Sequence, residues 1–149
     1  MPDATDFVHQ VDFEVRDYEC DLQGVVNNAV YQNYLEHARH QFLLSRGVDF
    51  VEMSRTGRQL VLVKATLEYR RSLRPKDRFR VETTAQMDGR VRFVFRQRLV
   101  GPDGKPILEA RMEGALVGPS GRPMASAELS AAICSEPESR SPSSAARDP

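Results

Sequence analysis

The chain has few cysteines, no excess of either charge and no long apolar run. Its two cysteines, Cys20 and Cys134, fit neither a metal-ligand spacing nor a disulfide framework, so we expect reduced thiols in a cytosolic compartment. Basic and acidic side chains number 21 each, so no global field attracts nucleic acid or an anionic membrane. No apolar run approaches the roughly 20 residues of a membrane span.

The ends of the chain differ from its middle. The N-terminus, MPDATDFVHQ, lacks both the apolar stretch of a signal peptide and the Arg/Ser-rich character of a transit peptide. We therefore expect a cytoplasmic protein, and a plastid location only if a leader is missing from this chain. The sequence SEPESRSPSSAARDP at the other end predicts disorder. We expect a flexible segment at 1–7, one domain at 8–132 and a disordered Ser/Pro-rich tail at 133–149.

One long helix is expected between residues 29 and 46. Tyr31, Leu35, Ala38 and Phe42 recur at helical spacing, which is typical of a helix that buries one face. Asn27 and Asn28 are both suitable N-cap residues, and a glycine at position 47 suits the C-terminal stop.

The remaining periodic segments predict antiparallel strands. Alternating residues at 9–17 indicate one strand before the helix, and residues 59–71, 78–87, 90–100 and 107–117 indicate four after it. A short further strand is expected after a turn at 119–121. This order predicts an α+β fold in which a five- to six-stranded antiparallel sheet wraps one long helix. Pairing of the long sheet edges across a homodimer would protect them.

The stretch with candidate chemistry is Asp21-Leu22-Gln23-Gly24-Val25-Val26-Asn27-Asn28-Ala29-Val30-Tyr31. It places a carboxylate in a glycine-containing loop just before the helix. Free N–H groups at the first helical turn could polarise a carbonyl, and Asp21 beside them could act as a general base or a nucleophile. By itself, an aspartate in such a loop is more often a turn former.

The stretch VRDYECDLQGVVNNAVYQNYLEHARHQFL resembles the hotdog-fold thioesterases related to 4-hydroxybenzoyl-CoA thioesterase. The likeness is greatest to the plant acyl-lipid thioesterases, also called methylketone synthase 2-like, which are similar in RDYE, in DxxGVVNNAVY and in ATLEYRRSLRPKDRF. It runs from about residue 8 to about residue 130. The resemblance implies a hotdog fold, a homodimer or homotetramer, and hydrolysis of acyl-CoA or acyl-carrier-protein thioesters.

The resemblance also implies roles for single residues. Asp21 matches the catalytic aspartate of the family, and the backbone N–H near Asn27 or Asn28 matches its carbonyl-polarising position. Many bacterial relatives carry a histidine where this chain has Asn28, which would make Asn28 an orienting residue instead. The further candidates for substrate contact are Gly24, Val25, Val26, Tyr31, Arg74 and Lys76.

Other residues allow competing hypotheses. Glu36 could replace Asp21, since some hotdog thioesterases use a glutamate on the helix. His37 and His40 have a spacing that suits a metal but lack a third ligand, so no metal site is expected. Cys20 has no histidine partner as a nucleophile. The following basic residues could bind CoA phosphates or an acidic carrier protein, or simply form an exposed strand face: Arg70, Arg71, Arg74, Lys76, Arg78 and Arg80.

The sequence thus predicts hydrolysis of acyl thioesters, with fatty or 3-oxoacyl groups on CoA or acyl carrier protein, to a free acid and a thiol. No cofactor, nucleic acid or membrane partner is expected. One alternative is a non-catalytic hotdog module that binds acyl thioesters. A hotdog dehydratase or hydratase is a weaker alternative, because no histidine follows Asp21 within the motif.

Overall fold

The computed structural model describes residues 9–134 and contains five strands and three α-helices. In chain order, its elements are β1 (His9–Glu14), a 3-10 turn η2 (Asp17–Glu19), α1 (Asn28–Ser45), α2 (Phe50–Arg55), β2 (Gln59–Tyr69), β3 (Arg78–Asp88), β4 (Arg92–Val100), β5 (Pro106–Val117) and α3 (Ala127–Cys134).

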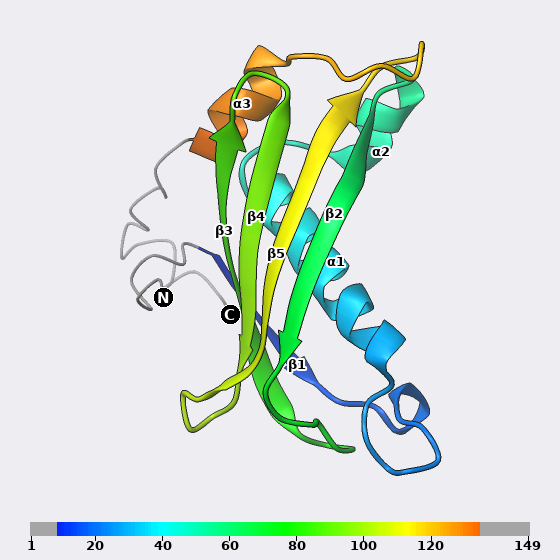
Figure 1. Ribbon diagram of the computed structural model, residues 1–149, viewed down its shortest axis with the longest axis vertical. Coiled ribbons are helices and arrows are strands. Elements are labelled where there is room, and N and C mark those ends of the chain that lie inside the picture. The colour runs from blue at the N-terminus through cyan, green and yellow to red at the C-terminus, as the bar shows by residue number, and fades with distance from the viewer. Residues whose placement is uncertain (1–8, 135–149) are drawn as a thin grey trace, which may run out of the picture.

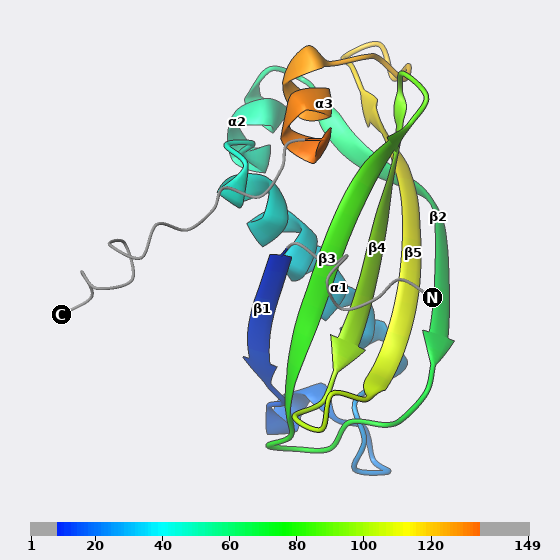
Figure 2. The same ribbon diagram turned by 90° about the vertical axis from the view of Figure 1, so that its left-hand side faces the viewer.

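The five strands form one antiparallel sheet in the order β1-β3-β4-β5-β2. The long helix α1 crosses one face of this sheet, and all three helices lie on that side (Figures 1 and 2). Because α1 packs mainly on β1 and β3, the edge strand β2 is less covered. Three consecutive apolar side chains of β2, Val61, Leu62 and Val63, are exposed.

Helix α1 is confirmed to within one residue of its predicted ends. It begins after Asn27, whose side-chain oxygen accepts a hydrogen bond from the Ala29 N–H at 3.0 Å. This cap satisfies one of the N–H groups that a helix start leaves unpaired. Four residues on the buried face of α1 have no exposed surface, and they form the centre of the core with the inner face of the sheet: Leu35, Ala38, Phe42 and Leu43.

A polar network crosses this apolar core. The Arg39 guanidinium donates from Nη1 to the Gln97 side-chain oxygen at 3.0 Å. The Gln97 amide in turn donates to the Leu35 carbonyl at 2.9 Å and to Thr83 Oγ1 at 3.1 Å. The network therefore joins α1 to β3 and β4 at the middle of the molecule, where unpaired polar groups would be costly.

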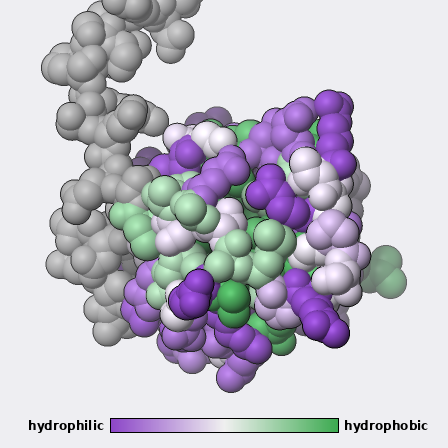
Figure 3. Space-filling view, turned by 90° about the horizontal axis from the view of Figure 1, so that it is seen from above, coloured by the Kyte–Doolittle hydropathy of each residue, from purple (hydrophilic) through white to green (hydrophobic). Residues whose placement is uncertain are grey.

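In place of the short further strand expected after the turn at 119–121, the described chain forms one isolated bridge between Val117 and Pro123, and α3 begins at Ala127. Leu129, Ala132 and Ile133 are buried at helical spacing, and α3 packs against β3. Figure 3 shows this end of the molecule, where hydrophobic side chains lie among hydrophilic ones. Helix α3 includes residues 133–134 of the predicted tail, whereas segments 1–7 and 135–149 lie outside the described residues. Within residues 9–134, no helix is long and apolar enough to cross a membrane.

Leu73 ties the connection between β2 and β3 to the start of α1. Its N–H donates to the Tyr31 hydroxyl at 3.1 Å, and its carbonyl accepts from the Val26 N–H at 2.8 Å. Both Leu73 and Tyr31 are 2% exposed, so water cannot easily replace either bond. The loop before α1 and the loop after β2 are therefore held as one unit.

We expect Tyr31→Phe to lower the free energy of unfolding by about 1–3 kcal/mol, because it leaves the buried Leu73 N–H without an acceptor. Tyr69→Phe is the matched control. Its side chain is 49% exposed, and this change should stay within about 0.5 kcal/mol. Urea unfolding of the two variants measures the difference. Equal stabilities would show that the Leu73 bond contributes nothing.

Candidate active site

A hollow of about 480 Å³ opens where α1 begins. Its walls come from the loop before α1, the first turn of α1 and the segment that follows β2. This surface, called here the Asp21 hollow, is lined by Asp21, Gln23, Val25, Val26, Asn27, Asn28, Tyr31, Tyr69, Arg70, Arg71 and Ser72.

A tight turn fixes the Asp21 carboxylate at the rim of this hollow. The Asp21 N–H donates to the Val25 carbonyl at 2.9 Å, and the Gly24 N–H donates to the Asp21 carbonyl at 3.0 Å. Gly24 has a φ of +75°, which only glycine adopts easily. Asp21 Oδ1 accepts from the Gln23 N–H at 2.8 Å. No described residue donates to Oδ2, so this oxygen is available to a water molecule or a substrate.

The first turn of α1 offers one N–H group to the same hollow. The Asn27 N–H is already used, because it donates to the Glu19 carbonyl at 3.1 Å. The Asn27 side-chain oxygen is also used, as the N-cap. Among residues 9–134, no acceptor binds the Asn28 N–H, which belongs to the first helical residue. An oxyanion at this point would also face the positive end of an 18-residue helix.

A second anchor holds the loop on the helix. The Tyr34 hydroxyl donates to the Glu19 carboxylate at 2.9 Å, and the Arg16 N–H donates to the same oxygen at 2.7 Å. Burial, followed by the bond to Glu19, raises the pKa of Tyr34. The hydroxyl therefore stays protonated and keeps donating at physiological pH.

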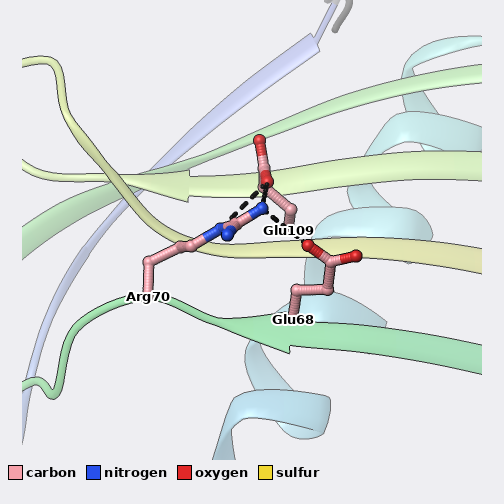
Figure 4. Close-up of polar contacts among 3 residues, drawn as sticks. All are labelled: Glu68, Arg70 and Glu109. Carbon is pink, nitrogen blue, oxygen red and sulfur yellow. Dashed lines mark hydrogen bonds and ion pairs between the residues drawn. The ribbon is translucent and has the colours of Figure 1, made fainter.

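The two arginines in the wall of the hollow have partners. Arg70 donates from Nη2 to Glu68 at 2.6 Å and to Glu109 at 2.8 Å, across the outer face of β2 and β5 (Figure 4). Arg71 makes two parallel bonds to the Asp103 carboxylate, at 3.0 and 3.1 Å. These carboxylates compensate both charges, so a phosphate would have to compete for them.

The structure gathers Asp21, Val25, Val26, Asn27, Asn28 and Tyr31 around the hollow. Gly24 forms the turn instead of the wall. Arg74 and Lys76 lie on the connection to β3, outside the lining, and within the described chain neither side chain forms an ion pair. The wall also includes Arg70 and Arg71, which the sequence offered as possible phosphate-binding residues, and Tyr69 and Ser72, for which the sequence carried no signal. The position of these four residues depends on how α1 crosses the sheet, which the pairing of neighbouring strands does not reveal.

The competing residues lie apart from this arrangement. Glu36 lines a different hollow, and its carboxylate is 3.7 Å from His40 Nε2. Within the described residues, no three His, Cys, Asp or Glu side chains gather as metal ligands. Desolvation, followed by nearby acidic groups that include Asp21, raises the pKa of Cys20. This shift disfavours the thiolate that a nucleophile needs.

The sequence of this chain is similar to those of known thioesterases. Residues 15–135 match the model of the thioesterase-like superfamily. The chloroplastic acyl-acyl carrier protein thioesterase ATL2 of Arabidopsis thaliana is 43% identical over 104 residues. The match covers 69% of this chain and 55% of that protein, so the chain spans about half the length of this curated relative.

Solved structures share the fold. The 1,4-dihydroxy-2-naphthoyl-CoA thioesterase of Synechocystis has a TM-score of 0.80 at 18% identity, covering 85% of this chain and 95% of its own. A protein of Aquifex aeolicus has a TM-score of 0.78 at 28% identity, covering 83% and 98%. The expected hotdog fold and the family resemblance are therefore confirmed, and this chain belongs to the thioesterase-like superfamily.

Proposed function

We propose that this protein hydrolyses acyl thioesters in the Asp21 hollow. The observation that carries the proposal is the pairing of two groups on one wall: a carboxylate whose Oδ2 has no described partner, and the Asn28 N–H at the start of α1. Acyl transfer to water needs a group that activates the nucleophile and a group that stabilises the oxyanion. The family membership supports the same reaction class.

The thioester carbonyl would sit at the start of α1, with its oxygen accepting from the Asn28 N–H. Asp21 Oδ2 would take a proton from water as the water oxygen attacks the carbonyl carbon. Collapse of the tetrahedral intermediate would break the C–S bond, and the proton would pass to the departing thiolate. Direct attack by Asp21, which gives an anhydride that water then opens, has the same products: a carboxylic acid and a thiol.

The acyl group and its carrier would contact different parts of the wall. Val25, Val26 and Tyr31 would contact the acyl group. Arg74 and Lys76, which form no ion pair among the described residues, would meet phosphate groups of CoA or of a carrier protein. We infer a fatty or 3-oxoacyl group, on CoA or acyl carrier protein. The name of the Arabidopsis relative supports the second carrier.

Asp21→Asn removes the carboxylate and nearly preserves its size. We expect the rate of thiol release from the best substrate in a panel of acyl-CoA and acyl-carrier-protein thioesters to fall about 100-fold or more, within the range of general-base catalysis. Asp17→Asn is the control, because Asp17 is exposed in the same loop region and does not line the hollow.

Three other outcomes would contradict this assignment. An unchanged rate in Asp21→Asn would remove the carboxylate from the mechanism. A comparable loss in Glu36→Gln alone would move the base to the helix. Binding of acyl thioesters without turnover by the wild-type protein would replace the hydrolase with a binding module.

Asn28 allows the backbone N–H to be tested separately from the side chain. Asn28→Pro deletes the N–H, and proline suits the first helical position. The preceding residue, Asn27, has φ −64° and ψ 139°, which a following proline tolerates. We expect Asn28→Pro to lower kcat about 100-fold, as for loss of one oxyanion donor. Asn28→Ala keeps the N–H and should retain most activity. If Asn28→Ala lost more activity than Asn28→Pro, the side-chain amide of Asn28, and not its backbone N–H, would stabilise the oxyanion.

We also propose a homodimer paired through β2. This 11-residue strand carries exposed apolar side chains and is an edge of the sheet within residues 9–134, and soluble proteins normally protect such edges. Val63→Lys places a charge at the irregularity between Leu62 and Lys64, where Val63 is 51% exposed. Sedimentation velocity should show a dimer for the wild type and more monomer for the variant. A wild-type monomer would contradict the proposal, as would an unchanged dimer in the variant.

A further inference from the structure

Three segments of the chain meet at Glu19. One oxygen of its carboxylate, Oε1, accepts from the Tyr34 hydroxyl of α1 at 2.9 Å and from the Arg16 N–H at 2.7 Å. The Glu19 carbonyl accepts from the Asn27 N–H at 3.1 Å, just before α1 begins. A single residue therefore connects the segment after β1, the loop that carries Asp21 and the long helix.

Neither Glu19 nor Tyr34 lines the Asp21 hollow. Glu19 is half-buried and lies two positions before Asp21, whereas Tyr34 is 4% exposed. Any effect of these two residues on a reaction in the hollow must therefore pass through a residue that does line it.

The bonds within the loop do not fix its orientation against α1. The Asp21 N–H donates to the Val25 carbonyl at 2.9 Å, and an isolated bridge pairs Cys20 with Val26. These contacts join residues of the loop to each other, so they would survive a rotation of the whole loop. The bond from the Val26 N–H to Leu73 holds only the end of the loop that enters the helix.

The Tyr34–Glu19 bond differs because it ties the other end of the loop to the second turn of α1. The ring of Tyr34 packs against Phe13, Phe79 and Tyr31, with centroids 5.3, 4.8 and 6.3 Å away. Packing on three sides leaves a buried aromatic ring in one orientation, so the position of its hydroxyl is fixed as well. A fixed donor on a helix can hold a carboxylate of the loop in one place.

We propose that Glu19 is a positioning residue, which through its bond to Tyr34 holds the Asp21 carboxylate in place beside the Asn28 N–H. This inference rests on the proposed hydrolysis, in which those two groups act on one thioester. A misplacement of about 1 Å in a catalytic group can cost about 100-fold in rate. Because the other bonds of the loop remain, we expect loss of this one bond to cost about tenfold.

Tyr34→Phe removes only the hydroxyl and keeps the packing of the ring. We expect kcat to fall about tenfold with KM unchanged, because an interaction that acts only on the reacting groups lowers kcat and kcat/KM together. Glu19→Ala should have the same effect. Glu19→Gln keeps an oxygen that can accept both bonds and should retain most of kcat.

Thr83→Val is the matched control for the loss of a buried hydrogen bond. The Thr83 hydroxyl accepts from the Gln97 amide at 3.1 Å in the core, and neither residue lines the Asp21 hollow. This variant should therefore keep the wild-type kcat. Urea unfolding of Thr83→Val and Tyr34→Phe shows whether the two changes lower stability to a similar degree.

A double variant separates positioning from a general effect on the enzyme. In Asp21→Asn the carboxylate that Glu19 would hold is absent, so adding Tyr34→Phe should lower the residual rate no further. The Asn27 N–H gives a readout that needs no turnover, because its bond to the Glu19 carbonyl closes the loop. Its hydrogen exchange should be several-fold faster in Tyr34→Phe and unchanged in Thr83→Val.

The proposal is overturned if Tyr34→Phe keeps the wild-type kcat, if Glu19→Gln is as slow as Glu19→Ala, or if Tyr34→Phe slows Asp21→Asn by the same factor as wild type. None of these results changes the loss of activity in Asp21→Asn, which tests the proposed hydrolysis by itself. A wild-type protein without turnover would instead overturn the hydrolysis. Exchange of the Asn27 N–H would then still show whether the Tyr34–Glu19 bond holds the loop.

Discussion

The burial of one face of α1 against the sheet is the interaction on which the rest of the structure depends. Leu35, Ala38, Phe42 and Leu43 lose all their exposed surface there, and each large apolar side chain so buried contributes about 1.5–3 kcal/mol. Because the helix is fixed by this contact, its first turn is fixed as well. The loop that carries Asp21 leads directly into this turn, and Asp21 and Asn28 line the same hollow.

The same packing leaves β2 partly uncovered. Helix α1 packs on β1 and β3, at one side of the sheet, and the Asp21 hollow and the hollow that Glu36 lines both open beside β2 at opposite ends of the helix. The polar network of Arg39, Gln97 and Thr83 lies between the helix and the central strands. It places the charged side chain of Arg39 beside the hollow that Glu36 lines. The apolar spacing along the helix gives no sign of this buried charge.

Much of the candidate site could be predicted from the sequence because its parts are close along the chain. Asp21, Gly24 and Asn28 lie within eight positions, so local rules of turn formation and helix capping bring them together. Arg70 and Arg71 could not be placed in this way. The segment that contains them is held beside the hollow by the hydrogen bonds of Leu73 to Tyr31 and Val26. Their ion pairs with Glu109 and Asp103 join residues more than 30 positions apart.

The sequence by itself determined the long helix, its cap, the number of main strands and the loop that carries Asp21, since periodicity and capping are properties of neighbouring residues. Only the tertiary structure decided that the segment after residue 126 packs as a helix against β3, that residues 69–72 join the wall of the Asp21 hollow, and that Arg39 borders a hollow. These features depend on which side chains meet across the core, and that is fixed by the packing of distant segments and not by any local pattern.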